Sequence, residues 1–288
     1  MTVHDGLWSA MEVAGRSTLL PVGPALGVVM AVLALVGTAV AAVGRLGYGP
    51  AVLRSGVRAA VQLALVSVVI AAITRSIPLT LAFVVLMYGV AARVAGRRIT
   101  TGRAVWWAAV PIGVATAPVV LMLVATGLVP PRGLTMIPIA GILIGGALTA
   151  TTLAGRRAMD ELAHRRGEVE AALSIGLTDR DAALEICRPH AATALIPALD
   201  QTRTVGLVTL PGAFVGMLLG GASPVAAGAV QLFVLIALLA VEAVAIVLTI
   251  ELVARGRFGH PVTIAVAGTA RPPRAERRRR QRKDQPAR

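Results

Sequence analysis

The sequence predicts an all-α, polytopic integral membrane protein with about seven transmembrane helices. The chain has 288 residues, of which 56% are hydrophobic and 15% are charged, and its mean hydropathy is +0.79. These values exclude an ordinary soluble domain. In lipid, backbone groups must bond within helices or within a closed barrel, whose strands alternate apolar and polar residues. Runs such as 28–43 show no alternation, so helices are expected.

Seven apolar stretches have roughly the 20 residues that a helix needs to cross the hydrocarbon core. In chain order they are residues 24–43, 58–74, 78–96, 104–128, 134–154, 193–217 and 225–251. Short loops separate the first five, and a longer polar segment, about 155–192, precedes the sixth. We therefore expect a transmembrane domain over residues 1–254, followed by a basic, disordered tail over 255–288.

Basic residues predict the orientation of these helices. The successive polar segments hold 1, 3, 1, 4, 1, 6, 0 and 11 basic residues. By the positive-inside rule, the N-terminus lies outside, and the segment 155–192 and the C-terminal tail lie in the cytoplasm. The tail has eleven basic residues against Glu276 and Asp284, which is +9 of the net +14. We expect it to lie near anionic lipid. We do not expect it to bind nucleic acid, because the sequence shows no folded nucleic-acid-binding domain beside it.

The inventory of metal ligands is small. Cys187 is the one cysteine, and no His/Cys pair has the spacing of a zinc or iron site. The histidines all fall outside the expected helices: His4, His164, His190 and His260. Lone methionines in membrane helices are typical of packing, and here they are Met87, Met122 and Met217. We therefore expect no metal centre and no cofactor bound by this chain.

The polar segment 155–192 contains an E-A-A-x-x-x-G run, formed by Glu170, Ala171, Ala172 and Gly176. Such a run between membrane helices is typical of the loop by which an ABC-transporter permease binds its ATPase. The sequence contains no nucleotide-binding loop of its own. The run therefore predicts a separate ATPase chain, which would bind ATP and Mg²⁺.

Local signals predict the shape of this loop. Gly176 is expected to end one helix, because glycine adopts the left-handed conformation freely. Thr178 and Asp181 have the spacing of an N-cap pair, so a short helix should begin at Asp179. We expect this short helix, 179–187, to offer small apolar side chains to a cleft of the partner: Ala182, Ala183 and Ile186.

Three strings between residues 137 and 224 are more specific: IPIAGILIGGALTATTLAGRRAMDEL, RRGEVEAALSIGLTDRDAALE and ALIPALDQTRTVGLVTLPGAFVGMLLGGASP. They resemble the Fet-type (FetB/YbbM-like) ABC transporter permease family, which is linked to bacterial iron export and, in plants, to aluminium tolerance. The resemblance covers most of residues 50–251. It implies a seven-helix permease that works with a separate ATPase and exports iron or another metal. It also implies that Glu170, Ala171, Ala172 and Gly176 dock the ATPase.

The chain departs from that family's pattern at two places. Where the family commonly has a methionine-rich LPGMMTG, this chain has LPGAFVG at 210–216. Where the family often has an asparagine in its fifth helix, this chain has Gly146. Both departures remove soft or polar side chains, so they weaken the metal assignment and leave the ATPase coupling intact.

Glu242 is the main candidate for a translocation pathway. An ionisable side chain inside a membrane helix is costly, so it is by default a functional hypothesis. It would line the pathway, bind a cation, or pair with Arg203 or Gln62. Asp200, Gln201 and Arg203 cluster at the start of the sixth expected helix, at a cytoplasmic mouth. Thr149 and Thr152 would line a polar passage or bond back to helix carbonyls.

Glycines spaced by four residues indicate faces for close helix packing. They form two sets: Gly141 and Gly145, and Gly212, Gly216 and Gly220. These faces would either hold helices together or slide during transport.

We therefore expect a permease subunit in a bacterial inner membrane and no enzyme activity in this chain. ABC ATPases act as dimers, so the expected unit is a permease homodimer with two ATPase subunits. Two alternatives stay open: an ABC permease for an organic solute such as a nucleotide sugar, and an ion-driven secondary transporter acting through Glu242.

Overall fold

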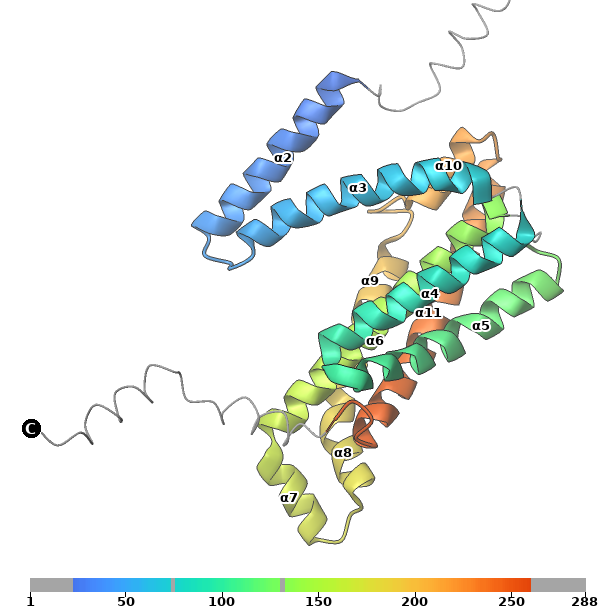
Figure 1. The fold of residues 1–288 in the computed structure, drawn as a ribbon. Helices are drawn as coiled ribbons and strands as arrows, with labels where there is room; N and C mark the ends of the chain where they lie inside the picture. Colours follow the sequence, from blue (N-terminus) through green and yellow to red (C-terminus); the bar gives the residue numbers. More distant parts are fainter. Residues whose placement is uncertain (1–22, 74–75, 130–132, 260–288) are drawn as a thin grey trace, which may run out of the picture. The chain divides into compact units, whose positions relative to one another are not determined.

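The computed structural model describes residues 23–73, 76–129 and 133–259 (Figure 1). The predicted tail from residue 260 onward, together with His4 and His260, lies outside these ranges. The described residues form two compact units, which divide between Arg75 and Ser76. Secondary structure in the described ranges is helical apart from one isolated bridge between Val205 and Thr209.

The first unit is a pair of helices, α2 (Pro24–Val43) and α3 (Gly49–Ile73), joined by a tight turn. Arg45 (φ 52°) and Gly47 (φ 75°) reverse the chain in this turn. Most apolar side chains of both helices are exposed within the unit. Such exposure is what lipid-facing helices require, because lipid is as apolar as their side chains.

The second unit is built around α6 (Gly133–His164) and α11 (Pro224–Ala254), which pack along each other. Two further helices cover them, α4 (Ile77–Ile99) and α5 (Ala109–Ala125). A 3₁₀ helix, η1 (Gly102–Ala108), connects α4 to α5. Small side chains let these backbones approach closely. The fully buried alanines at the contacts include Ala92, Ala95, Ala147, Ala154 and Ala245, all 0% exposed.

Glycines allow three of the closest helix contacts. A Cβ on Gly96 would lie 2.0 Å from the carbonyl oxygen of Val105, so only glycine lets η1 lie directly on α4. A Cβ on Gly155 would lie 2.5 Å from Ile99 Cδ1, and one on Gly146 would lie 2.6 Å from Leu238 Cδ2. Gly155 therefore sets the spacing between α6 and α4, and Gly146 sets the spacing between α6 and α11.

Among the described residues, six helical segments are long and apolar enough to cross a membrane. They are Pro24–Val43, Gly49–Val68, Ile77–Ile99, Gly102–Ala125, Thr135–His164 and Pro224–Ala254. The predicted all-α, multi-pass membrane fold is confirmed. Helices α6 and α11 have 32 and 31 residues, or roughly 48 and 46 Å at 1.5 Å per residue, so both extend past the hydrocarbon core.

The structure differs from the prediction over residues 193–217, where one continuous helix was expected. This segment contains η2 (Thr193–Leu195), α9 (Ile196–Thr204), a loop and α10 (Gly212–Leu219). Gly206 has φ +84° in the loop, and Pro211 caps α10 in an extended conformation. Average hydropathy does not register such a backbone break. The segment nevertheless lies along α11, on which both α9 and α10 pack.

Candidate coupling loop and transport cavity

The E-A-A-x-x-x-G run lies on α7 (Arg166–Ser174) and in the turn that follows it. Gly176 has φ +97°, and its N–H donates to the carbonyl of Leu173 (3.0 Å). The N–H of Leu177 donates to the carbonyl of Ala172 (3.1 Å), which completes a Schellman motif. The predicted helix end at Gly176 is therefore confirmed.

The next helix, α8 (Asp179–Ala192), begins as predicted. The hydroxyl oxygen of Thr178 accepts a hydrogen bond from the N–H of Asp181 (3.2 Å), and the hydroxyl donates to Asp181 Oδ2 (2.8 Å). Local bonds thus determine a helix, a sharp turn and a second helix. In Figure 1, α7 and α8 lie together at one end of the second unit.

The expectation that α8 exposes its small apolar face is wrong. Ala182 is 0% exposed, Ala183 is 8% exposed and Ile186 is 7% exposed, because this face packs against α6 and α11 of the same chain. Sequence periodicity shows that a helix has an apolar face, and tertiary structure decides what covers that face. Cys187 lies on this face as well, and burial raises the pKa of its thiol to about 11.

The exposed part of the loop is α7, which has no buried residue. Glu170 and Ala171 are exposed, Ala172 is half-buried, and Ile175 is 79% exposed. A groove of about 290 Å³ separates α7 from the ends of α6, α8 and α11. Its apolar lining includes Leu162, Val169, Leu173, Val253 and Ala254, and its polar lining includes Arg166, Glu170 and Asp179.

An ion pair joins α8 to α11. The Nε and Nη2 atoms of Arg180 donate to the two carboxylate oxygens of Glu251, at 2.7 and 2.8 Å. This two-point hydrogen bond raises the pKa of Arg180. Arg255 Nε also donates to Glu251, at 2.6 Å. A displacement of α8 would therefore act on α11 through charged contacts as well as through the buried apolar face.

A second cavity, of about 260 Å³, lies between α6, α9 and α11. It brings together three of the predicted pathway residues: Thr149 from α6, Gln201 from α9 and Glu242 from α11. A Cβ on Gly146 would lie 2.9 Å from Glu242 Oε1, so this glycine lets the carboxylate lie directly against α6. The position where the resembling family often has asparagine is thus in contact with the carboxylate.

Three other predicted pathway residues of the second unit do not line this cavity: Thr152, Asp200 and Arg203. Thr152 is buried, and its hydroxyl donates to the carbonyl of Leu148 (2.7 Å). The hydroxyl of Thr149 likewise donates to the carbonyl of Gly145 (3.0 Å), so both threonines bond back to their own helix. Asp200 and Arg203 are exposed and pair with each other at 3.6 Å. Arg203 therefore does not take the predicted place beside Glu242, and among the described residues no ion pair involves Glu242. Gln62 lies on α3, in the first unit.

Sequence reasoning missed Gln231 on α11. Its side chain is 6% exposed, and within the described part of the chain its Oε1 has no hydrogen-bond partner. It lines a cavity of about 170 Å³ against the loop between α9 and α10, beside Val205, Gly206 and Pro211. The sequence signal that could have identified Gln231 is its position as a single amide side chain inside the apolar run of α11.

The predicted glycine faces are mostly open in this chain. A Cβ on Gly141 would touch Met87 Cε at 3.0 Å, as packing requires. No described atom outside their own helix and chain neighbours lies within 4 Å of a Cβ built on Gly145, Gly212 or Gly216, and Gly220 meets only carbonyls of α10. Close packing within the chain depends instead on Gly96, Gly146 and Gly155.

Known proteins resemble this chain over most of its length. The family model described as "Uncharacterised protein family (UPF0014)" matches residues 25–258. "UPF0014 membrane protein STAR2" of Oryza sativa subsp. japonica is 33% identical over 210 residues, 71% of this chain and 73% of that protein. "UPF0014 membrane protein YjkA" of Bacillus subtilis (strain 168) is 30% identical over 195 residues, 67% of this chain and 78% of that protein.

A third relative carries a functional name. "Probable iron export permease protein FetB" of Escherichia coli (strain K12) is 31% identical over 134 residues, 46% of this chain and 52% of that protein. No solved structure matches the chain significantly.

Proposed function

Since the chain belongs to the UPF0014 family of membrane proteins, we propose that it is the membrane-spanning permease subunit of an ABC transporter. The observation that carries this proposal is the E-A-A-x-x-x-G loop, built as an exposed helix and a tight turn that lead into a second helix with one buried face. The partner is a separate ATPase, which binds ATP and Mg²⁺. Because ABC ATPases work as dimers, the unit contains two permeases and two ATPases.

The loop is suited to transmitting force. Helix α7 and the turn after it offer the exposed side chains of Glu170 and Ile175, and the groove behind α7, to the ATPase. Helix α8 is anchored by its buried face and by the Arg180–Glu251 ion pair. Movement of α7–α8 is thereby passed to α6 and α11, which together with α9 line the cavity containing Glu242.

The translocation path follows α11 where it faces the interrupted segment α9–α10. Discontinuous helices inside membranes are typical of substrate sites, because their freed backbone groups and adjacent polar side chains can bind solutes. Gln231 and Glu242 are eleven residues apart on α11, which places them on nearly the same helix face, three turns apart. The cavity beside each of them lies against α9, α10 or the loop between them.

Iron or another metal is the proposed substrate, and export is the proposed direction. The named function of the E. coli relative supports this assignment. The carboxylate of Glu242, the amide of Gln201 and the hydroxyl of Thr149 supply oxygen ligands of the kind that hold hard cations. Three such groups would hold a cation weakly and reversibly, as transport requires.

The proposed location is a bacterial inner membrane, with the N-terminus outside and the C-terminus and α7–α8 in the cytoplasm. Labelling can test this orientation. Cys187 is buried and its thiol pKa is raised to about 11, so it should not react with maleimide at neutral pH. A cysteine placed at the exposed Ala171 should then react only with a reagent that reaches the cytoplasm.

The central test is co-purification of an ATPase from native membranes in mild detergent. The charge reversal Glu170→Arg on α7 should abolish co-purification, whereas Glu185→Arg, an exposed glutamate on α8, serves as the matched control. Loss in the first variant and retention in the second supports docking through α7. Absence of any ATPase with the wild-type chain would count against the proposal.

One observation favours a second candidate, an ion-driven secondary transporter: Glu242 lies in a cavity, and no described ion pair neutralises it. Proteoliposomes separate the two mechanisms. Metal transport that requires ATP and the ATPase supports the permease. Transport driven by an ion gradient alone, and lost in Glu242→Gln, would establish the alternative.

A further inference from the structure

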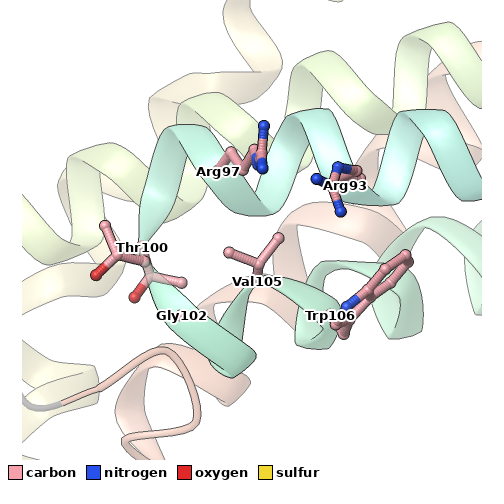
Figure 2. Close-up of a pocket in the computed structure, with 7 residues that line it drawn as sticks. Arg93, Arg97, Thr100, Gly102, Val105 and Trp106 are labelled. Carbon is pink, nitrogen blue, oxygen red and sulfur yellow. The ribbon is translucent and has the colours of Figure 1, made fainter.

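A pocket of about 390 Å³ lies at the end of α4, where η1 folds back against it (Figure 2). Arg93 and Arg97 come from successive turns of α4, and Val105 and Trp106 come from η1. The close contact at Gly96 creates this arrangement, because it brings the η1 backbone onto α4 between the two arginines. Gly102, with φ +73°, makes the turn that precedes η1.

The pocket is positively charged. Among the described residues, no ion pair involves Arg93, Arg97 or the neighbouring Arg98 and Arg103. The guanidinium of Arg257 adds a further positive charge nearby, 4.8 Å from the ring centroid of Trp107 on η1. The helix dipole accounts for basic residues in the last turn of α4, but Arg93 lies outside that turn. A cluster of this kind is suited to an anion, and guanidinium groups match the geometry of phosphate.

The depth of the pocket indicates where the phosphate comes from. Arg93 is sixteen residues from the start of α4, or roughly 24 Å, within a hydrocarbon core of about 30 Å. Its guanidinium would reach the headgroup layer by extending along the helix. The phosphate groups of the surrounding leaflet lie in that same layer. Trp106 is 53% exposed, as expected for a tryptophan at the membrane interface.

Apolar side chains continue from the pocket toward the middle of the membrane. Val90 on α4 and Val110 and Val114 on α5 are 50%, 38% and 51% exposed. The two helices lie side by side here, because the hydroxyl of Tyr88 donates to the carbonyl of Ala109 (2.8 Å). They offer acyl chains an apolar surface next to the arginines.

We propose that this pocket binds the phosphate group of an anionic phospholipid from the surrounding leaflet. The arginines bind the phosphate, Trp106 lies at the level of the glycerol backbone, and the acyl chains lie against α4 and α5. The inference does not depend on the transported substrate or on the ATPase. It predicts that anionic lipid is bound at a defined place on the transmembrane domain, apart from any attraction to the basic tail.

Tryptophan quenching tests the proposal on the full-length chain. The chain has three tryptophans, so Trp8→Phe leaves Trp106 and Trp107 as reporters on η1. The protein is reconstituted in phosphatidylcholine, with brominated phosphatidylglycerol or brominated phosphatidylcholine added. Brominated phosphatidylglycerol should quench the reporters preferentially. In Arg93→Gln/Arg97→Gln this preference should fall by a factor of about five for each arginine, about twenty-five-fold for both, at low ionic strength.

The matched control is Arg54→Gln/Arg58→Gln, which removes two exposed arginines at the same spacing on α3. The preference should survive in this variant, and both variants should melt in pure phosphatidylcholine at the wild-type temperature. An equal loss in the control would mean that total charge, and not the pocket, selects the lipid. Relief of quenching by inorganic phosphate, at the concentration of the lipid phosphate, would mean that the site takes free anions. Either result would overturn the proposal, as would the absence of any headgroup preference in the wild-type chain.

Discussion

Replacing Gly176 with alanine should loosen the turn between α7 and α8. Gly176 has φ +97°, and no described atom outside its chain neighbours lies within 4 Å of the position of an added Cβ. The cost is therefore backbone strain alone, roughly 1–2 kcal/mol for a left-handed alanine. The lower entropy of alanine in the open chain offsets about half of this cost. A net cost of about 1 kcal/mol corresponds to a roughly fivefold larger open population.

Hydrogen exchange of the full-length chain in lipid nanodiscs measures that population. The amides of Gly176 and Leu177, which donate to the carbonyls of Leu173 and Ala172, should exchange about fivefold faster in Gly176→Ala. Gly167→Ala is the matched control, because Gly167 lies inside α7, has an ordinary φ and also has open space around it. That variant should exchange no faster than wild type, since alanine favours a helix by about 1 kcal/mol over glycine.

The same pair of variants links the turn to the proposed coupling. If the docking surface requires the closed turn, ATPase co-purification should weaken in Gly176→Ala and not in Gly167→Ala. Equal exchange rates in the two variants would refute the structural reasoning about the turn. Faster exchange with unchanged ATPase binding would refute the role of the turn in docking.

Three further predictions concern the rest of the second unit. Gly146→Leu should lower the free energy of unfolding by roughly 1–3 kcal/mol, because the added side chain overpacks against Leu238 and Glu242. Gly145→Leu should melt near the wild-type temperature, because a Cβ at Gly145 meets open space. Equal melting temperatures of the two variants would contradict this reasoning. Arg180→Ala should leave the fold intact but reduce ATP-driven transport relative to ATP hydrolysis, because it removes the ion pair to α11; unchanged coupling would show that the buried face of α8 is sufficient. Burial raises the pKa of the Cys187 thiol to about 11, whereas the unfolded thiol has a pKa of about 8.5. The contribution of this thiol to folding stability is therefore complete below about pH 8.5. It is lost as pH rises toward 11, because the unfolded chain then ionises more readily than the folded one. Maleimide labelling should therefore stay slow up to pH 8 and become fast on unfolding, and rapid labelling of the folded chain would contradict the burial.

Features determined by a few neighbouring residues were predictable. The helix end at Gly176 and the N-cap at Thr178 depend on bonds between residues at most five positions apart, so the sequence was sufficient for both. The membrane helices were predictable because each needs only its own apolar length. The family was predictable because the strings around the E-A-A-x-x-x-G run are specific.

Features that depend on a distant partner were not predictable. Ala182, Ala183 and Ile186 were expected to face a partner protein, but they are covered by α6 and α11, which no local pattern indicates. The break in the sixth expected helix also escaped prediction, because hydropathy averages over Gly206 and Pro211 without registering the change in backbone direction.

The candidate transport cavity also has features that the sequence could predict and features that it could not. Thr149, Gln201 and Glu242 could each be chosen from the sequence as polar groups in apolar surroundings. The sequence by itself determined the class of protein, the loop motif and the residue types that lipid makes costly. Only the tertiary structure decided that these three side chains share one cavity and that Gly146 lies against the carboxylate. The physical reason is that hydropathy and capping act along the chain, whereas a cavity is formed by helices that meet only after packing.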